Sequence, residues 1–201
     1  MNKGKKMNKT NDIAAIVMAS GLSRRMGEDK LKLPFRGKLL YQHIVDIVSD
    51  LPFKEKIIVT SKDYIAEYSK GKNFTTVMNP EAYKGQSLSI IKGLEKASES
   101  KGYMFFVADQ PFLKKETILH LIQIFDENSD KITLPFFCGI KGNPVIFPHR
   151  LKKDLLQIEG DQGGSVVIKK EWDKSIKIDF NHPIEGLDID TMENYNKYKE
   201  S

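Results

Sequence analysis

The chain has 201 residues, of which 40% are hydrophobic and 29% charged, as expected for a globular protein with a core of its own. Its single cysteine, Cys138, excludes an internal disulfide and a cysteine-rich zinc site. The sequence contains neither an apolar run long enough to span a bilayer nor a signal-peptide pattern, so we expect a cytoplasmic protein with no membrane partner.

The net charge of +5 is concentrated at one end of the chain. Four lysines lie in the first nine residues, which hold no acid, and this leaves 28 basic against 27 acidic side chains in the other 192 residues. We expect residues 1–11 to form a disordered basic tail and residues 12–201 to fold as a single domain. Because the folded part is nearly neutral, the charge does not indicate a nucleic-acid partner.

Apolar runs alternate with amphipathic runs along most of the chain. The apolar runs predict buried strands at 13–19, 56–61, 75–79, 103–109 and 131–137. The amphipathic runs have apolar residues three or four apart and predict helices at 39–49, 87–97 and 115–126. Continuous apolar strands separated by helices indicate βαβ units, so we predict an α/β protein with a mostly parallel sheet.

The elements become shorter after residue 137. Residues 138–148 combine turn residues with a short apolar run and predict a hairpin or inserted flap, which is antiparallel. A helix is predicted at 149–158, followed by a glycine-rich loop at 159–164, a short helix and a late strand with the sequence IKIDF. Thr191 is suited to be the N-cap of a final helix.

Residues 18–35 carry much positive charge and directly follow the first predicted strand. In an open α/β sheet, ligands bind beyond the carboxyl ends of the strands. Gly21 and Gly27 allow backbone N–H groups to approach an anion closely, and Arg25 and Lys30 supply charge. The segment therefore predicts a cradle for a triphosphate, although neither common glycine-rich nucleotide motif is present. The alternative is a basic loop in solvent.

Three aspartates are candidates for a metal site, and the one at the end of a predicted strand points into the same crevice as the charged segment. Asp109 ends the strand at 103–109, and Pro111 prevents that strand from continuing. Asp188 and Asp190 are two residues apart and share a face if the chain there is extended. Mg²⁺ prefers one or two carboxylates together with substrate phosphates, so these aspartates indicate a magnesium site, with Mn²⁺ as the alternative metal. The other interpretations are a turn or capping aspartate at 109 and a solvated edge strand.

Segments along almost the whole chain resemble the MobA-like nucleotidyltransferases, in particular the molybdenum cofactor cytidylyltransferases. MASGLSRRMGEDKLKLP is similar to their LAAGxSxRMGxxK…P loop, and NPEAYKGQSLSIIKGL to their NPxxxxGxSxSLxxGL segment. VADQP matches the DQP metal motif, GNPVIF and GDQGG match GxPVxF and GDxGxR, and LDIDTMENY resembles DIDTPEDY. The resemblance implies a Rossmann-like three-layer α/β/α nucleotidyltransferase fold.

The resemblance also implies roles for particular residues at the nucleotide. The backbone contacts to the base and ribose would come from Ala19, Ser20 and Gly21. The rest of the nucleotide pocket would come from Gly85, Ser87 and Ser89. The triphosphate would be held by Arg25 and Lys30, which together with Asp109 are the expected catalytic residues.

Further roles are implied at the metal and at the acceptor. Asp109 would bind Mg²⁺, with Asp190 as the preferred second ligand and Asp188 as the less favoured one. The acceptor side would consist of Asn143, Pro144, Gly160, Asp161 and Gly163.

The implied reaction transfers CMP from CTP to the molybdopterin-bound molybdenum cofactor and releases pyrophosphate. The terminal phosphate of the pterin attacks the α-phosphorus of CTP, while Mg²⁺ and Lys30 stabilise the developing charge. A molybdenum hydroxylase is the expected recipient of the product. Guanylyl-transferring relatives carry a second glycine near Ser20, so this serine favours cytidine.

Three alternatives to this reaction stay open. They are guanylyl transfer to the same acceptor, nucleotidyl transfer to a sugar 1-phosphate or another phosphorylated alcohol, and a non-catalytic cofactor carrier for a hydroxylase. GDQGGS lacks the arginine that often follows the GDxG core, which leaves the acceptor less defined than the transfer. The retained Lys30 and Asp109 disfavour the carrier. No predicted helix has an extra apolar face, which favours a monomer.

Overall fold

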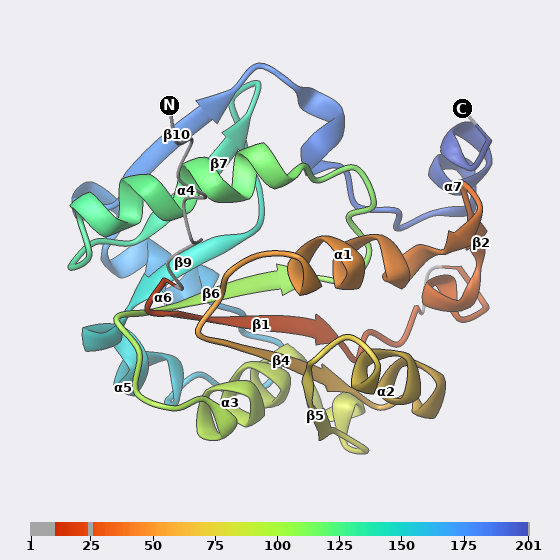
Figure 1. Ribbon diagram of the computed structural model, residues 1–201, viewed down its shortest axis with the longest axis horizontal. Coiled ribbons are helices and arrows are strands. Elements are labelled where there is room, and N and C mark those ends of the chain that lie inside the picture. The colour runs from red at the N-terminus through yellow and green to blue at the C-terminus, as the bar shows by residue number, and fades with distance from the viewer. Residues whose placement is uncertain (1–10, 24–25, 201) are drawn as a thin grey trace, which may run out of the picture.

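The computed structural model describes residues 11–23 and 26–200 (Figure 1). The predicted tail therefore falls, apart from Asn11, outside the described residues, and so does Arg25. The backbone N–H of Asn11 donates a hydrogen bond to the carbonyl oxygen of Pro52 at 2.9 Å.

One eight-stranded sheet forms the centre of the structure, in the order β10-β7-β9-β6-β1-β4-β5, with β8 paired to β7. The strands are β1 (Ile13–Ala19), β4 (Glu55–Thr60), β5 (Thr75–Met78), β6 (Gly102–Val107), β7 (Thr133–Phe137), β8 (Ile140–Lys141), β9 (Val145–Pro148) and β10 (Ile176–Phe180). β1 is parallel to β4 and β6, β4 to β5, and β7 to β10. β9 is antiparallel to β6 and β7, and β8 to β7. The mostly parallel sheet and its late antiparallel insertion are confirmed.

Helices cover both faces of this sheet (Figure 1). One face carries α1 (Leu40–Ser49), α2 (Asp63–Lys70) and α4 (Lys115–Glu127). The other carries α3 (Gln86–Lys96), α5 (Lys152–Leu155) and α6 (Ser165–Lys170). A last helix, α7 (Met192–Tyr198), is capped by the Thr191 side chain, which accepts from the N–H of Asn194 at 3.2 Å. The three-layer α/β/α arrangement is therefore confirmed.

The strand β1 shows why its sequence is a continuous apolar run. Ile13, Ala15 and Val17 belong to the hydrophobic cluster on one face of the sheet. Ala14 and Ile16 belong to the cluster on the other face. Because helices cover both faces, every position of this central strand except the half-buried Met18 is removed from water.

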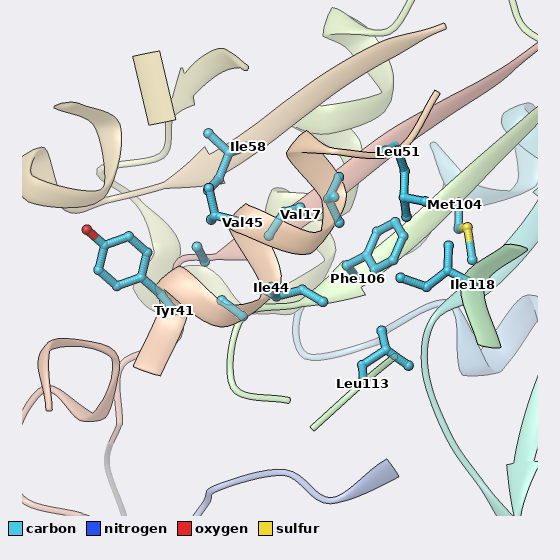
Figure 2. Close-up of a cluster of buried hydrophobic side chains, with 14 of the residues drawn as sticks. Val17, Tyr41, Ile44, Val45, Leu51, Ile58, Met104, Phe106, Leu113 and Ile118 are labelled. Atoms are coloured by element: carbon cyan, nitrogen blue, oxygen red, sulfur yellow. The ribbon is translucent and has the colours of Figure 1, made fainter. Parts of the chain in front are cut away.

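The larger cluster fixes the central strands against the helices. Figure 2 shows Val17 of β1, Ile58 of β4 and Phe106 of β6 meeting Ile44 of α1 and Ile118 of α4. None of these five side chains is more than 1% exposed. Such close packing leaves little freedom for the strands, and it therefore sets where the residues beyond their carboxyl ends lie.

The structure differs from the sequence interpretation in several places. The helix α2 and a short hairpin of β2 (Pro34–Phe35) and β3 (Lys38–Leu39) were not predicted. The strand β6 ends at Val107, so Asp109 lies in the turn beyond it. The helix expected at 149–158 is a 3₁₀ turn followed by α5, because the N–H of Gln157 bonds to Asp154 three residues back and closes the helix.

Candidate active site

The strand order creates a topological switch point between β1 and β6. The chain places β4 and β5 on one side of β1 and β6 on the other, so the connections leave these two strands in opposite directions. Crevices at such points, beyond the carboxyl ends of the strands, bind ligands in open α/β sheets. A cleft of about 390 Å³ opens here, lined by Ser20 and Gly21 after β1 and by Ala108 and Asp109 after β6. The predicted meeting of the charged loop with Asp109 is thus present.

Lys30 is the central charged group of this cleft. It begins a 3₁₀ turn, Lys30–Lys32, which the Asp29 side chain caps by accepting from the N–H of Leu31. Its side chain is buried, and its Nζ donates to Asp109 Oδ2 at 2.5 Å and to Asp190 Oδ1 at 2.6 Å. Burial alone would lower the pKa of Lys30, but the Asp109 and Asp190 carboxylates outweigh burial and raise it. The ammonium therefore holds together two acids that are far apart in the sequence.

Two carboxylate oxygens in the same region lack hydrogen-bond partners. Asp109 Oδ1 and Asp188 Oδ1 are buried and accept no hydrogen bond from the described residues. Burial, followed by the nearby charge of Asp109, raises the pKa of Asp188 to about 6. Buried acceptors without a donor are costly, and a cation satisfies them. These oxygens therefore fit a divalent metal.

The protein supplies only part of a metal coordination shell. No group of three or more His, Cys, Asp or Glu side chains in residues 11–23 and 26–200 is placed to hold a metal ion. Mg²⁺ characteristically completes its shell with water and substrate phosphates. The donor set thus suits a metal that is shared with a phosphorylated ligand.

The segment carrying Asp188 and Asp190 is coil and lies directly on the turn that carries Asp109. The N–H of Ile189, a fully buried residue between them, donates to the Asp109 carbonyl oxygen at 3.0 Å. The Gln110 side chain donates to the Gly186 carbonyl oxygen at 3.4 Å. Hydrogen bonds to the turn bring these acids to the site, and the segment is not the solvated edge strand of the alternative interpretation.

Two residues of this arrangement were missed by the sequence interpretation. Gln110 is buried, and its place between Asp109 and Pro111 in the quoted VADQP segment was the available signal. Glu185 is 1% exposed, and its carboxylate accepts from Thr117 Oγ1 at 2.5 Å and lies 3.0 Å from Lys114 Nζ. Nothing in the sequence around Glu185 distinguishes it from a surface glutamate. It anchors the start of the acidic segment to α4.

The residues predicted to contact the nucleotide are divided between the cleft and the sheet. The Ser20 hydroxyl donates to the Val59 carbonyl oxygen at 3.1 Å, and the Ala19 carbonyl oxygen accepts from Thr60 Oγ1 at 3.1 Å. Both contacts tie the end of β1 to β4. Ser20 and Gly21 line the cleft. Because the Ser20 hydroxyl already donates to Val59, these two residues present mainly backbone polar groups to the cleft.

The N-terminus of α3 is fastened to the glycine-rich loop at 159–164. The backbone N–H and hydroxyl of Ser87 donate to the Gly160 carbonyl oxygen at 3.1 and 2.7 Å. Gly85 has φ +122°, and a Cβ at this position would overlap the Gly160 carbonyl. Ser89, whose hydroxyl accepts from Asn79 Nδ2 at 3.0 Å, lines the cleft together with Gly85. Ser87 thus supports the wall of the cleft from behind.

A second pocket of about 200 Å³ adjoins the cleft. It is lined by two predicted acceptor residues, Asn143 and Gly163, together with Lys141 and Phe147. Asn143 precedes Pro144 through a cis peptide bond. Gln86 lines both cavities, while Asp161 lines the cleft of about 390 Å³. Two of the five predicted acceptor residues thus line the second pocket, Asp161 lines the cleft together with predicted nucleotide residues, and Pro144 and Gly160 line neither cavity.

This arrangement can hold two ligands next to each other. The cleft offers an ammonium, free carboxylate oxygens and backbone N–H groups to a phosphorylated compound. The second pocket offers an apolar wall with an amide and an ammonium at its rim.

None of the helices in the described parts of the chain is long and apolar enough to cross a membrane.

Residues 15–175 match the sequence model of the family described as the MobA-like NTP transferase domain. A probable molybdenum cofactor guanylyltransferase of Natranaerobius thermophilus is 32% identical over 65% of this chain and 63% of its own, just under two thirds of that relative's length. The molybdenum cofactor cytidylyltransferase of Escherichia coli is 28% identical over 67% of this chain and 69% of its own. The purine catabolism protein PucB of Bacillus subtilis is 24% identical over 91% of this chain and 94% of its own.

Solved structures show the same fold. The Mycobacterium tuberculosis protein Rv0371c superposes with a TM-score of 0.78 at 20% identity, over 96% of this chain and 100% of its own. A complex of that protein with manganese superposes with a TM-score of 0.74, over 95% and 100%. At this level of identity the likeness concerns the fold.

Proposed function

The chain belongs to the MobA-like NTP transferase family, and on this basis we propose that it transfers CMP from CTP to the molybdopterin-bound molybdenum cofactor. The products are the cytosine dinucleotide form of the cofactor and pyrophosphate. One observation carries the proposal: Lys30, Asp109 and Asp190 meet in a cleft that adjoins a second pocket.

The nucleotide occupies the cleft in this proposal. The backbone of Ser20 and Gly21 contacts the base and ribose, and the wall around Gly85 closes the site on the other side. Lys30 and Arg25 hold the triphosphate, Arg25 lying outside the described residues. A lysine suits this position because its ammonium on a long flexible stem can follow phosphate oxygens.

A divalent metal belongs to the same site. Asp109 would hold it, together with Asp190 or Asp188. The unpartnered oxygens described above belong to Asp109 and Asp188. When bound, Mg²⁺ or Mn²⁺ neutralises negative charge on the phosphates. The manganese complex of the mycobacterial neighbour supports a divalent cation in this fold.

The acceptor occupies the second pocket, which Asn143 and Gly163 line, with Asp161 on the side of the cleft. Pro144 and Gly160 are neighbours of these residues in the chain and complete the proposed acceptor side. An oxygen of its terminal phosphate attacks the α-phosphorus, and the bond to the pyrophosphate breaks as the new P–O bond forms. Because that phosphate is already ionised, the reaction needs positioning and charge neutralisation rather than a general base. The cationic Lys30 and the two adjoining cavities supply these conditions.

Guanylyl transfer to the same acceptor is the second candidate function. The relative with 32% identity is named a probable guanylyltransferase, whereas the named cytidylyltransferase is 28% identical. Ser20, in place of the second glycine of guanylyl-transferring relatives, supports cytidine. Transfer to another phosphorylated acceptor and a non-catalytic carrier are the remaining outcomes. The proposed recipient is a molybdenum hydroxylase, and the proposed state is a monomer.

The test is pyrophosphate release from CTP, GTP, ATP or UTP in the presence of Mg²⁺ and the molybdopterin-bound cofactor. We expect release with CTP, and none in the Asp109→Asn variant. Asp173→Asn, a change at an exposed aspartate in the 3₁₀ turn Trp172–Lys174, is the matched control and should keep the wild-type rate. Release with GTP instead would support the second candidate. No release with any nucleotide would contradict transfer to this acceptor.

A further inference from the structure

The ammonium of Lys30 occupies the space that a metal bound to Asp109 and Asp190 would need. Its Nζ lies 2.5 Å from Asp109 Oδ2 and 2.6 Å from Asp190 Oδ1, with 7% of the residue exposed. Both contacts are charge-assisted hydrogen bonds, and both are shorter than the usual length of about 2.7–2.9 Å. In this state the two carboxylates share one positive charge, which the protein itself supplies.

A divalent metal and this ammonium compete for the same oxygens. Two cations in contact with one pair of carboxylates repel each other, and solvent screens the repulsion only in part, because the side chains of Lys30 and Asp109 are 9% and 18% exposed. The metal therefore binds these oxygens well only when Lys30 has moved away. A metal at the two unpartnered oxygens, Asp109 Oδ1 and Asp188 Oδ1, would still share the Asp109 carboxylate with this ammonium, which bonds Asp109 Oδ2.

A nucleotide triphosphate provides a new partner for Lys30. Phosphate oxygens attract an ammonium as carboxylates do, and the four-carbon stem of lysine allows the exchange without a change in the backbone. The backbone at Lys30 is itself fixed, because its N–H donates to Ser23 Oγ at 3.1 Å and the 3₁₀ turn is capped by Asp29. Only the side chain has to move.

We propose that Lys30 is a resident counter-cation of Asp109 and Asp190 that blocks metal binding until nucleotide phosphates take it over. The metal then enters together with the nucleotide rather than before it. This inference rests on the proposed function for the identity of the phosphate ligand, but its central claim concerns the protein without nucleotide.

The experiment is a titration of the whole chain with Mn²⁺ in the absence of nucleotide and acceptor, with free Mn²⁺ measured by electron paramagnetic resonance. Wild type should bind weakly. Lys30→Met should bind about tenfold more tightly or better, since a unit positive charge is removed from contact with both ligands. Lys32→Met is the matched control, because Lys32 is exposed in the same turn and its Nζ lies over the Tyr64 ring. That control should bind as wild type does.

A gain of affinity on removing a side chain is not the result of simple damage to the fold. The double variant Lys30→Met, Asp109→Asn should lose the gain, which would place the Mn²⁺ at Asp109. Equal Mn²⁺ affinity in wild type and Lys30→Met would overturn the proposal. If Lys30→Met does not fold, Lys30→Gln carries the same expectation, because its uncharged amide can still donate to Asp109.

The result is separable from that of the proposed function, since the titration contains neither nucleotide nor acceptor. Pyrophosphate release without the Mn²⁺ gain would leave the function standing and refute the role of Lys30. A gain in Mn²⁺ affinity without pyrophosphate release from any nucleotide would support the role of Lys30 and refute the proposed function.

Discussion

Replacement of Glu185 by alanine should destabilise the protein by about 3 kcal/mol, since a hydrogen bond to a charged group is worth about 1.5–3 kcal/mol and a buried donor left unpaired adds to the loss. The carboxylate is 1% exposed and accepts from the Thr117 hydroxyl at 2.5 Å, and Thr117 is itself only 5% exposed. The ion pair with Lys114 contributes little to this figure, because that lysine side chain is 52% exposed and regains water.

Urea unfolding followed by circular dichroism measures this loss as a change in the free energy of unfolding. Glu185→Gln should cost only about 1 kcal/mol, because its amide oxygen still accepts from Thr117. Glu99→Ala is the matched control, since the Glu99 side chain is 88% exposed, and it should stay within about 0.5 kcal/mol of wild type. A loss in Glu185→Ala no larger than that of the control would refute the anchoring role of Glu185.

Three further substitutions, and Gly37→Ala as the control for one of them, test other parts of the structure. Burial raises the pKa of Asp188 from 3.8 to about 6, so the folded protein loses stability as pH rises through this range and the carboxyl group ionises. Asp188→Asn should therefore raise the Tm much more at pH 8 than at pH 4. An equal rise at both pH values would contradict this. Gly85→Ala should cost about 3 kcal/mol or more in urea unfolding, because it adds overlap with Gly160 to an unfavourable φ. Gly37→Ala, with positive φ but open space, should cost about 1 kcal/mol, and equal losses would refute the overlap. Phe106→Ala should cost about 3–5 kcal/mol by calorimetry, and a loss under 1 kcal/mol would argue against the packing in Figure 2.

The sequence was sufficient to predict the sheet and its main helices. The run from Ile13 to Ala19 is apolar at every position, which is the pattern of a strand covered on both faces, and the structure places it at the centre. The helix α2 was missed because it is short and largely polar, with Ile65 and Ala66 as its main buried apolar contacts. Short elements of this kind depend on tertiary packing more than on local pattern.

The main charged residues of the candidate site were predictable from the sequence, but their contacts and the roles of Gln110 and Glu185 were not. Lys30 and Asp109 stand out by residue type and by their place in segments that follow or end a predicted strand, and Asp190 by its spacing from Asp188 and by the resemblance of LDIDTMENY to a family segment. Their sequence gives no sign that the lysine is bonded to both aspartates, because these residues are 79 and 160 positions apart from it. Contacts over such separations depend on strand order and turn geometry, which local patterns do not encode.

By itself, then, the sequence determined which segments are buried and which chemistry follows them, since hydrophobic period and residue type are local properties. The tertiary structure decided which charges neutralise one another. It turned Lys30 toward two carboxylates, left oxygens of Asp109 and Asp188 without donors, and buried Glu185 as the anchor of the acidic segment. The physical reason is that burial and electrostatic pairing depend on distances between residues remote in the chain, and folding alone sets those distances.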